Sequence, residues 1–339
     1  MKFFASKACI AVAIGSAFLL TACGGGSPAA SSTTTTTASM ITSSNAPDVA
    51  AHAFSASDGL AGQSNSSSTL LTGVSTDTVS SGLLDSSLLQ IYRALDVRSA
   101  ANLVTGVTST ASASCTNGGT IAVTASIAVA GKISNGDSLS ITATNCVEGT
   151  TKLNGGLGVT FSNMAGTFGS SSIWSGTLAL TFTNLSVDTG TESSTANGDL
   201  TLIYSQTGFQ NSTAVVSGNS LQLTLTKSGV TVVNRTLSAF KHTSSINSTL
   251  YTYNNNYTLA GNFPKLGNVS YAVKTITDFK KQAGSYPYQG SMIITAGDKT
   301  TATLTAIDSI NVKIELDKNG DGVIDETINT TWVALKNRI

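Results

Sequence analysis

Apolar residues alternate with small or polar ones along most of the chain after Cys115. A period of two is typical of a β-strand with one buried and one exposed face, because successive side chains point to opposite sides of the sheet. The pattern predicts strands around these apolar runs: Ile121–Val129, Leu157–Phe161, Leu178–Phe182, Leu200–Tyr204, Leu221–Leu225, Val269–Val273 and Val312–Leu316.

Turn-forming residues separate many of these runs. They include Asn135-Gly136-Asp137, Asn154-Gly155-Gly156, Asn197-Gly198-Asp199 and Ser217-Gly218-Asn219. One-sided alternation with short connections indicates a mainly β chain with a large antiparallel sheet, and we expect on the order of a dozen strands. Such a sheet closes as a sandwich or a barrel, or curls around a helix as a half-barrel, and the pattern does not choose among the three.

Two helices are predicted before the strands and are expected to pack on the sheet. Asn45-Ala46-Pro47-Asp48 combines a capping residue, a first-turn proline and an acid near the positive end of the helix dipole. This helix is expected to end at about Ser57. A second helix is indicated by apolar residues that share one face: Leu84, Leu88, Ile91 and Leu95.

Composition narrows the kind of partner and surface. Lysine plus arginine equals aspartate plus glutamate at 18 each, so no overall charge favours nucleic acid. Only 11% of the residues are charged, which leaves serine, threonine, asparagine and glycine to form the polar surface. These residue types suit strands and turns better than surface helices.

The N-terminus carries an export signal. Lys2 and Lys7 precede an apolar run from Ala8 to Leu20, which is too short to span a bilayer but suits a signal peptide. Leu20-Thr21-Ala22-Cys23 resembles the lipobox of bacterial lipoproteins. That resemblance implies cleavage before Cys23, acyl chains such as palmitate on this cysteine, and a membrane partner held through the lipid. Because Gly24 is not aspartate, it also implies the outer membrane.

These signals divide the chain into four segments. Residues 1–22 form the signal peptide, and residues 23–44 form a lipidated tether rich in serine, threonine and glycine. Residues 45–110 form a helical segment, and residues 111–339 form the antiparallel β domain. The alternating strands, the cysteine hairpin and the C-terminal Asp/Asn loop look similar to uncharacterised proteobacterial envelope lipoproteins, and this resemblance implies no activity.

Two cysteines remain after Cys9 leaves with the signal and Cys23 takes the lipid. In an exported chain, Cys115 and Cys146 are expected to form a disulfide. Pairing Ile121 with Ile141 and Val123 with Leu139 would align them if a bulge near Gly118-Gly119 added one residue.

Residues 317–325, with the sequence DKNGDGVID, resemble the calcium loops of EF-hands, dockerins and thrombospondin type 3 repeats. Oxygen ligands at alternating positions suit a structural Ca²⁺, and a glycine at the sixth position allows the sharp turn. The expected ligands are Asp317, Asn319, Asp321, Val323 through its carbonyl, and Asp325, with Glu326 replacing the missing acid at Ile328. Pairing Leu316 with Ile328, and Val312 with Trp332, would make the loop the tip of a hairpin. A turn without metal remains the alternative.

No catalytic residues are predicted, and the chain is expected not to be an enzyme. Gly136–Ser140 resembles the nucleophile block of GDSL esterases, but neither His52 nor His242 lies in the required Asp-x-x-His. His242 is expected to be solvated. Glycoside hydrolysis by a pair of carboxylates remains an alternative, with Glu148, Asp188 and Glu192 as the candidates.

Two functions remain. The first is an outer-membrane-anchored lipoprotein with a non-enzymatic binding or structural role in the cell envelope. A glycan, a protein or a lipid would be its ligand, and Tyr251, Tyr253 and Tyr257 would either bind sugar or cover a sheet edge. The alternative is a carrier that holds an apolar ligand or lipid in a curved β-sheet pocket, a comparison that rests on fold analogy.

Overall fold

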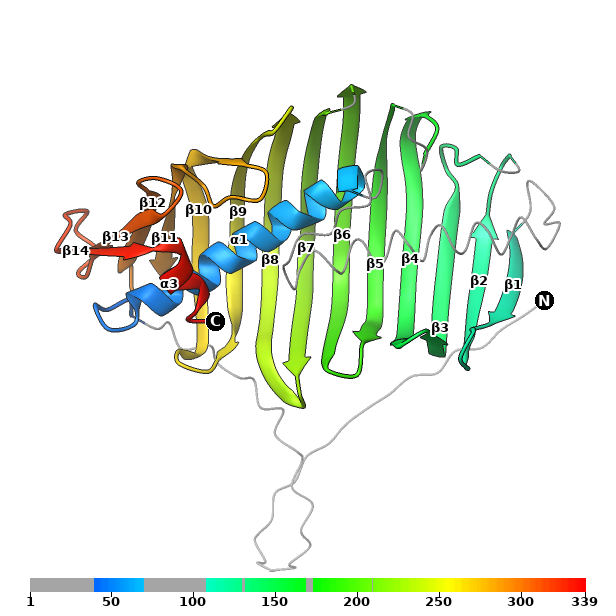
Figure 1. Cartoon of the computed structure of the whole chain (residues 1–339), viewed down its shortest axis with the longest axis horizontal. Coiled ribbons are helices and arrows are strands. Elements are labelled where there is room, and N and C mark those ends of the chain that lie inside the picture. The colour runs from blue at the N-terminus through cyan, green and yellow to red at the C-terminus, as the bar shows by residue number, and fades with distance from the viewer. Residues whose placement is uncertain (1–39, 70–107, 130–131, 169–172, 209) are drawn as a thin grey trace, which may run out of the picture. The chain divides into compact units, whose positions relative to one another are not determined.

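The computed structural model describes residues 40–69, 108–129, 132–168, 173–208 and 210–339, without the side chains of 61–69. Its strands form one antiparallel sheet of 14 strands, in which each strand pairs with its neighbours in sequence (Figure 1). The predicted fold class, a mainly β chain with a large antiparallel sheet, is confirmed. The strands are β1 Thr108–Ser114, β2 Thr120–Ser126, β3 Ser138–Glu148, β4 Thr151–Gly166, β5 Trp174–Asp188, β6 Glu192–Gly208, β7 Asn211–Lys227, β8 Val230–Asn247, β9 Leu250–Phe263, β10 Gly267–Gln282, β11 Gln289–Ala296, β12 Thr301–Ala306, β13 Asn311–Asp317 and β14 Glu326–Thr331.

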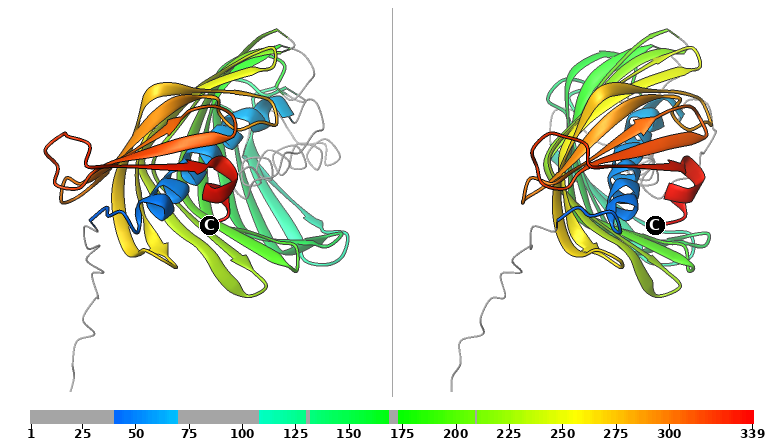
Figure 2. Two further views of the ribbon diagram at one scale, coloured as in Figure 1. Left: turned by 60° about the vertical axis from the view of Figure 1, so that its left-hand side comes forward. Right: turned by 90° about the vertical axis from the view of Figure 1, so that its left-hand side faces the viewer.

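The sheet is curved and open, with β1 and β14 at its two ends (Figure 2). Its apolar side chains share the concave face. Val123, Ile141, Leu157 and Phe182 illustrate this, because they pair across four neighbouring strands and all are buried. Burying a side chain of this size stabilises the fold by roughly 1.5–3 kcal/mol. Of the three architectures that the alternation left open, the structure therefore has the half-barrel.

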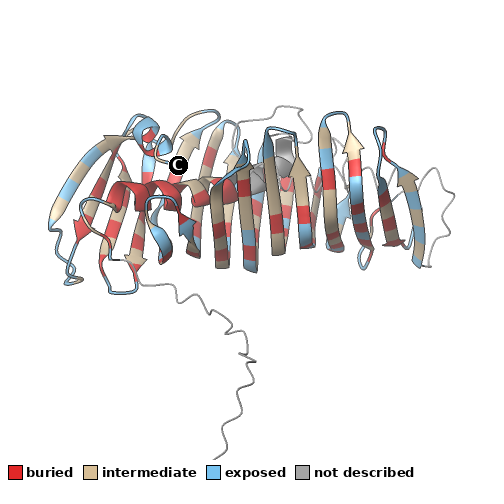
Figure 3. Ribbon diagram, turned by 90° about the horizontal axis from the view of Figure 1, so that it is seen from below, coloured by how far each residue is buried: buried red, intermediate tan, exposed pale blue. Residues whose placement is uncertain are grey.

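Helix α1 (Ala46–Thr69) lies on the concave face and contacts strands β6–β9 and β11–β13 (Figures 1 and 2). The helix is buried along much of its length (Figure 3). Its buried side chains include four alanines, Ala46, Ala50, Ala53 and Ala56, which allow a close approach, and the larger Phe54, whose ring lies against Phe279. The predicted start at Asn45–Asp48 is confirmed, and helix and sheet belong to one compact unit.

The predicted end of this helix at Ser57 is wrong, since α1 continues to Thr69. Serine and glycine after Ser57 have low helix propensity. Tertiary contacts of Ser57 and Asp58 with β9 and β10 outweigh that preference, because both side chains bind residues of the sheet. The second predicted helix, Leu84–Leu95, lies outside the described residues. Within the described residues, no helix has the length and apolarity needed to cross a membrane.

Three predicted turns are instead β-bulges inside long strands. Asn154-Gly155-Gly156 lies in β4, Asn197-Gly198-Asp199 in β6 and Ser217-Gly218-Asn219 in β7, at or beside shifts of the pairing register. Gly155 and Gly198 have φ values of +94° and +121°. A glycine with positive φ serves a turn and a bulge equally well, so the sequence signal is the same for both. β1 also begins at Thr108, earlier than the predicted boundary at 111.

Both predicted hairpin registers are wrong by two residues. Ile121 pairs with Ala143 and Val123 with Ile141, while Leu316 pairs with Glu326 and Val312 with Thr330. A shift of two keeps every side chain on its own face, so alternation alone does not distinguish the registers. Trp332 begins the short helix α3 (Trp332–Lys336) instead of continuing β14.

Candidate functional site

A layer of polar side chains lies between α1 and the concave face of β8, β9 and β10. We call it the α1 polar layer, and its members are His52, Ser55, Ser57, Asp58, Arg235, His242, Tyr251, Tyr253, Asn255, Tyr257 and Lys281. Buried polar groups are costly unless they are hydrogen-bonded, so the partners of each group decide what the layer does.

His242 is at the centre of this layer and is fully buried, which corrects the expectation that it is solvated. Its Nδ1 lies 2.7 Å from Oδ1 of Asn255, and the Asn255 amide donates to the hydroxyl of Ser57 on α1. An amide oxygen only accepts, so Nδ1 carries the ring proton. Burial lowers the pKa of His242 to about 4, although the hydrogen bond with Asn255 favours the charged form. The histidine is therefore neutral and connects β8 through β9 to α1.

The three tyrosines of β9 lie under α1 rather than at a sheet edge or on a sugar-binding surface, which corrects both readings. Tyr251, Tyr253 and Tyr257 are each at most 4% exposed. The Tyr257 hydroxyl donates to the carbonyl of Ala53 on α1. The Tyr253 hydroxyl has no hydrogen-bond partner among the described residues, and burial raises the pKa of this tyrosine well above its usual value.

Ion pairs hold α1 at both ends of the layer. Asp48 binds Lys265 at 3.4 Å and Arg338 at 3.1 Å, and Asp58 binds Lys281 at 2.8 Å. The ammonium group of Lys281 also lies over the rings of Tyr251 and Tyr253, at 5.6 and 5.9 Å from their centroids. These contacts fix the helix to the sheet.

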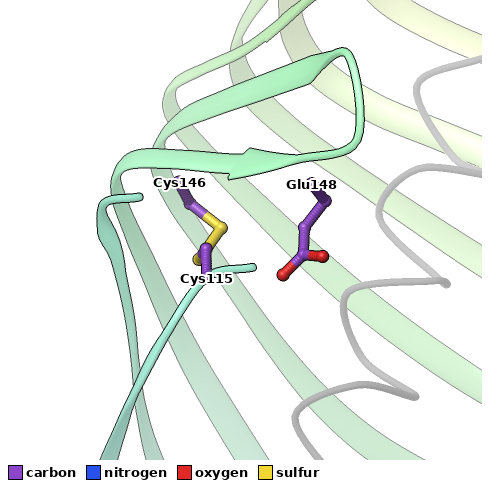
Figure 4. Close-up of side chains that lie close together, drawn as sticks. All are labelled: Cys115, Cys146 and Glu148. Carbon is purple, nitrogen blue, oxygen red and sulfur yellow. A yellow bond between two sulfur atoms is a disulfide. The ribbon is translucent and has the colours of Figure 1, made fainter. Parts of the chain in front are cut away.

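The disulfide is found where it was predicted. The sulfur atoms of Cys115 and Cys146 are 2.00 Å apart, and the Glu148 carboxylate lies beside them (Figure 4). Next to the disulfide, the register of β3 against β4 is irregular around Asn145, and the Asn145 carbonyl leaves no room for a side chain at Gly119. On the chain-entropy model a loop of this length stabilises by about 3–4 kcal/mol.

Cys115, Cys146 and Glu148 form the one group of three cysteine, histidine or acidic residues in the described part of the chain whose ligand atoms lie within 4.8 Å. A cysteine binds a metal ion as a thiolate, and sulfurs joined in a disulfide are not thiolates. Glu148 accepts hydrogen bonds from the backbone and the hydroxyl of Thr116. The geometry of this group is therefore that of a structural disulfide with a hydrogen-bonded glutamate beside it.

The predicted calcium loop lies between β13 and β14, and Asp317 organises it. Its carboxylate accepts hydrogen bonds from the backbone N–H groups of Gly320 at 2.7 Å and Gly322 at 2.8 Å, and longer ones from Asn319 and Asp321. Burial acts to raise the pKa of the Asp317 carboxyl, but these N–H groups outweigh it and hold the pKa below its usual value. These hydrogen bonds to Asp317 stabilise the turn.

Of the other predicted ligands, Asn319 and Asp321 lie beside Asp317, whereas Asp325 and Glu326 bind Lys318 and Ser43. Asn319 donates to the Asp321 carboxylate at 2.9 Å, beside Asp317. Asp325 accepts from the Lys318 backbone, Glu326 binds Lys318 and Ser43, and Val323 is 63% exposed. Calcium binding remains a prediction that competes with a turn held by Asp317 alone.

A melting experiment separates the two. If the loop binds calcium, a concentration of about a hundred times Kd should raise Tm by about 4 °C, and Asp317→Asn should abolish the rise. Asp308→Asn is the matched control, because Asp308 also accepts backbone N–H groups, from Ile310 and Asn311, in a different turn. An equal Tm with calcium and with a chelator would leave the turn without metal.

The other acids that were candidates for catalysis form hydrogen bonds or ion pairs with nearby residues. Asp137, in the segment resembling the GDSL block, accepts from the backbone of Ala128 and Ser134 and is 2% exposed. Asp188 accepts from Gly190, and Glu192 forms an exposed ion pair with Lys227 at 3.0 Å. Each carboxylate has a structural partner. Cys23 lies outside the described residues.

Sequence reasoning missed Ser57, Asn255 and above all Arg235 as members of the α1 polar layer. A usable signal was present, because Tyr251, Tyr253, Asn255 and Tyr257 share the period of two that places Leu259 on the buried face. No protein-family model, curated protein or solved structure matches the chain.

Proposed function

We propose that this protein is an outer-membrane lipoprotein with a non-enzymatic binding role in the cell envelope. The lipobox at Leu20–Cys23 and the polar tether after it support the anchor. In the α1 polar layer, Asn255, Tyr257 and Lys281 bind α1 through hydrogen bonds and an ion pair. These groups attach the helix to the sheet, which supports a binding role over catalysis.

The observation that carries the proposal is the concave face itself. Buried apolar side chains line this face from β2 to β13, interrupted by the α1 polar layer on β8, β9 and β10, whereas α1 contacts only strands between β6 and β13 (Figure 1). Small-molecule sites are mostly concave and lined by apolar side chains, and this buried lining of an unclosed sheet has both properties, which supports a long apolar ligand.

Between a surface binder and a carrier, the carrier reading has the better support. The Tyr/Asn stretch, which was the candidate for sugar recognition, is buried under α1 at Tyr251, Tyr253, Asn255 and Tyr257. An acyl chain or a similar apolar ligand would instead use the concave face. A purely structural role is the alternative that the experiment below distinguishes.

Native mass spectrometry of the whole chain, purified from the envelope in a mild detergent, tests the proposal. We expect the mass of the chain from Cys23 with its acyl chains, plus a second, non-covalent mass excess that is lost on collisional activation. Cys23→Ser is the control for the anchor, because serine cannot carry the thioether-linked lipid; since cleavage follows lipidation, its product should lack the covalent excess and keep residues 1–22.

The result is decisive in either direction. A covalent lipid with no dissociable ligand, before and after extraction of bound lipids, would favour the structural role. A mature chain without acyl chains on Cys23 would contradict the anchor. A dissociable apolar ligand in both the native chain and the Cys23→Ser chain would establish the carrier.

A further inference from the structure

Arg235 on β8 is a buried cation that has no counter-ion among the described residues. The residue is 6% exposed, and its Nη1 donates one long hydrogen bond of 3.4 Å to the Ser55 hydroxyl on α1. Its Nε has no hydrogen-bond partner among the described residues. A buried guanidinium normally pairs with an acid, because leaving it unpaired costs several kcal/mol.

The acids of α1 do not supply this counter-ion. The helix contains two, and Asp48 is bound by Lys265 and Arg338 while Asp58 is bound by Lys281. The other titratable neighbours of Arg235 are the neutral His52, whose pKa is lowered to about 4 by burial and by Arg235 itself, and the un-ionised Tyr257. The site is thus electropositive.

The position of Arg235 in its strand suggests what kind of molecule supplies the counter-ion. β8 begins at a hairpin with exposed Val230, and Arg235 is its first buried residue. Its nearest buried neighbours on this face include the apolar Leu237 on β8 and Leu259 on β9, which are 1% and 0% exposed. Arg235 therefore lies where the buried stretch of β8 begins, between α1 and apolar side chains of the sheet.

We propose that Arg235 binds the anionic head, a carboxylate or a phosphate, of an amphipathic ligand whose acyl chain extends along the concave face. This inference rests on the proposed function and names the chemistry of its ligand. A guanidinium is suited to the task because it presents several N–H donors in a plane that match carboxylate and phosphate oxygens.

The test compares ligands that differ only in the head. Native mass spectrometry of the whole chain, stripped of bound lipid and kept in one detergent, would measure the binding of palmitate, of palmitoyl lysophosphatidate and of neutral hexadecanol. Charge-assisted hydrogen bonds should make one or both acids bind about 10- to 100-fold more tightly than the alcohol. Whichever acid is preferred identifies the head as carboxylate or phosphate.

Arg235→Met should remove this preference while keeping hexadecanol binding. Because the variant also removes an unpaired buried charge, its ligand-free form should melt on the order of 2–4 °C higher than the original chain. Lys281→Met is the matched control. It removes a cation that already has its carboxylate, Asp58, so the head preference should persist and Tm should fall.

Equal binding of the acids and the alcohol would overturn the role of Arg235 and leave the carrier function standing. Failure of all three amphiphiles to bind would overturn both. Binding of inorganic phosphate without any amphiphile would also overturn the inference, because the acyl chain is part of it. A strongly destabilised Arg235→Met would assign the guanidinium to the fold instead.

Discussion

Lowering the pH from 7 to 5 is expected to cost the folded protein about 4 kcal/mol, because both of its histidines are buried in the neutral form. Burial lowers the pKa of His52 and of His242 from 6.5 to about 4. Well above pH 6.5 both rings are neutral in the folded and in the unfolded chain. Between pH 6.5 and pH 4 the histidines of the unfolded chain bind protons, whereas those of the folded chain stay neutral. The free energy of unfolding therefore decreases as the pH is lowered and levels off near pH 4.

Urea unfolding at pH 7, 6 and 5 measures this loss, which amounts to about 2 kcal/mol for each histidine. The acids with lowered pKa, Asp308, Asp317 and Glu326, are still ionised over this range and do not interfere. His242→Gln should halve the pH dependence whatever its own stability at pH 7. A free energy of unfolding that stays constant between pH 7 and 5 would show that the rings are hydrated.

Trp332→Ala is expected to destabilise the protein by about 3–5 kcal/mol, because it empties a packed aromatic site. The indole is 1% exposed, lies 4.4 Å from the ring of Phe54 on α1, and stacks on Tyr286 at 6.0 Å. Its Nε1 also donates to the carbonyls of Pro287 and Asp308. The residue therefore joins α1, α3 and the end of the sheet.

Trp332→Phe separates the packing of this site from its hydrogen bonds. A phenyl ring fills most of the volume but leaves both carbonyls without the indole N–H, so we expect a loss of about 1–3 kcal/mol. Chemical denaturation followed by circular dichroism gives both values. If the alanine variant lost less than the phenylalanine variant, the indole would not be part of the core.

The sheet was predictable from the sequence because its signal is local. Each strand alternates on its own, as Leu178, Leu180 and Phe182 show, and their buried face follows from the apolar positions. Closure was not predictable, since it depends on whether β1 and β14 meet, and no single strand encodes that. Glycines such as Gly155 and Gly198 predicted turns because positive φ is common to turns and bulges.

The candidate site was harder to predict because it joins distant segments. Ser57 and Asn255 are separated by 198 residues, and Ser55 and Arg235 by 180. Polar residues are usually exposed, so the sequence placed His242 and the tyrosines of β9 on the surface, although they lie on a buried strand face. Only the position of α1 over β8 and β9 gives these residues partners.

The sheet consists entirely of hairpins between sequence neighbours, whereas α1 contacts strands from β6 to β13. A chain that crosses a membrane N-terminus first would deliver α1 before any strand on which it rests. Its alanine-rich face would remain uncovered until the C-terminal half had emerged. Attachment of α1 would therefore complete the maturation of the protein, and a truncated chain would keep its assembled hairpins but expose this helix to proteases and chaperones.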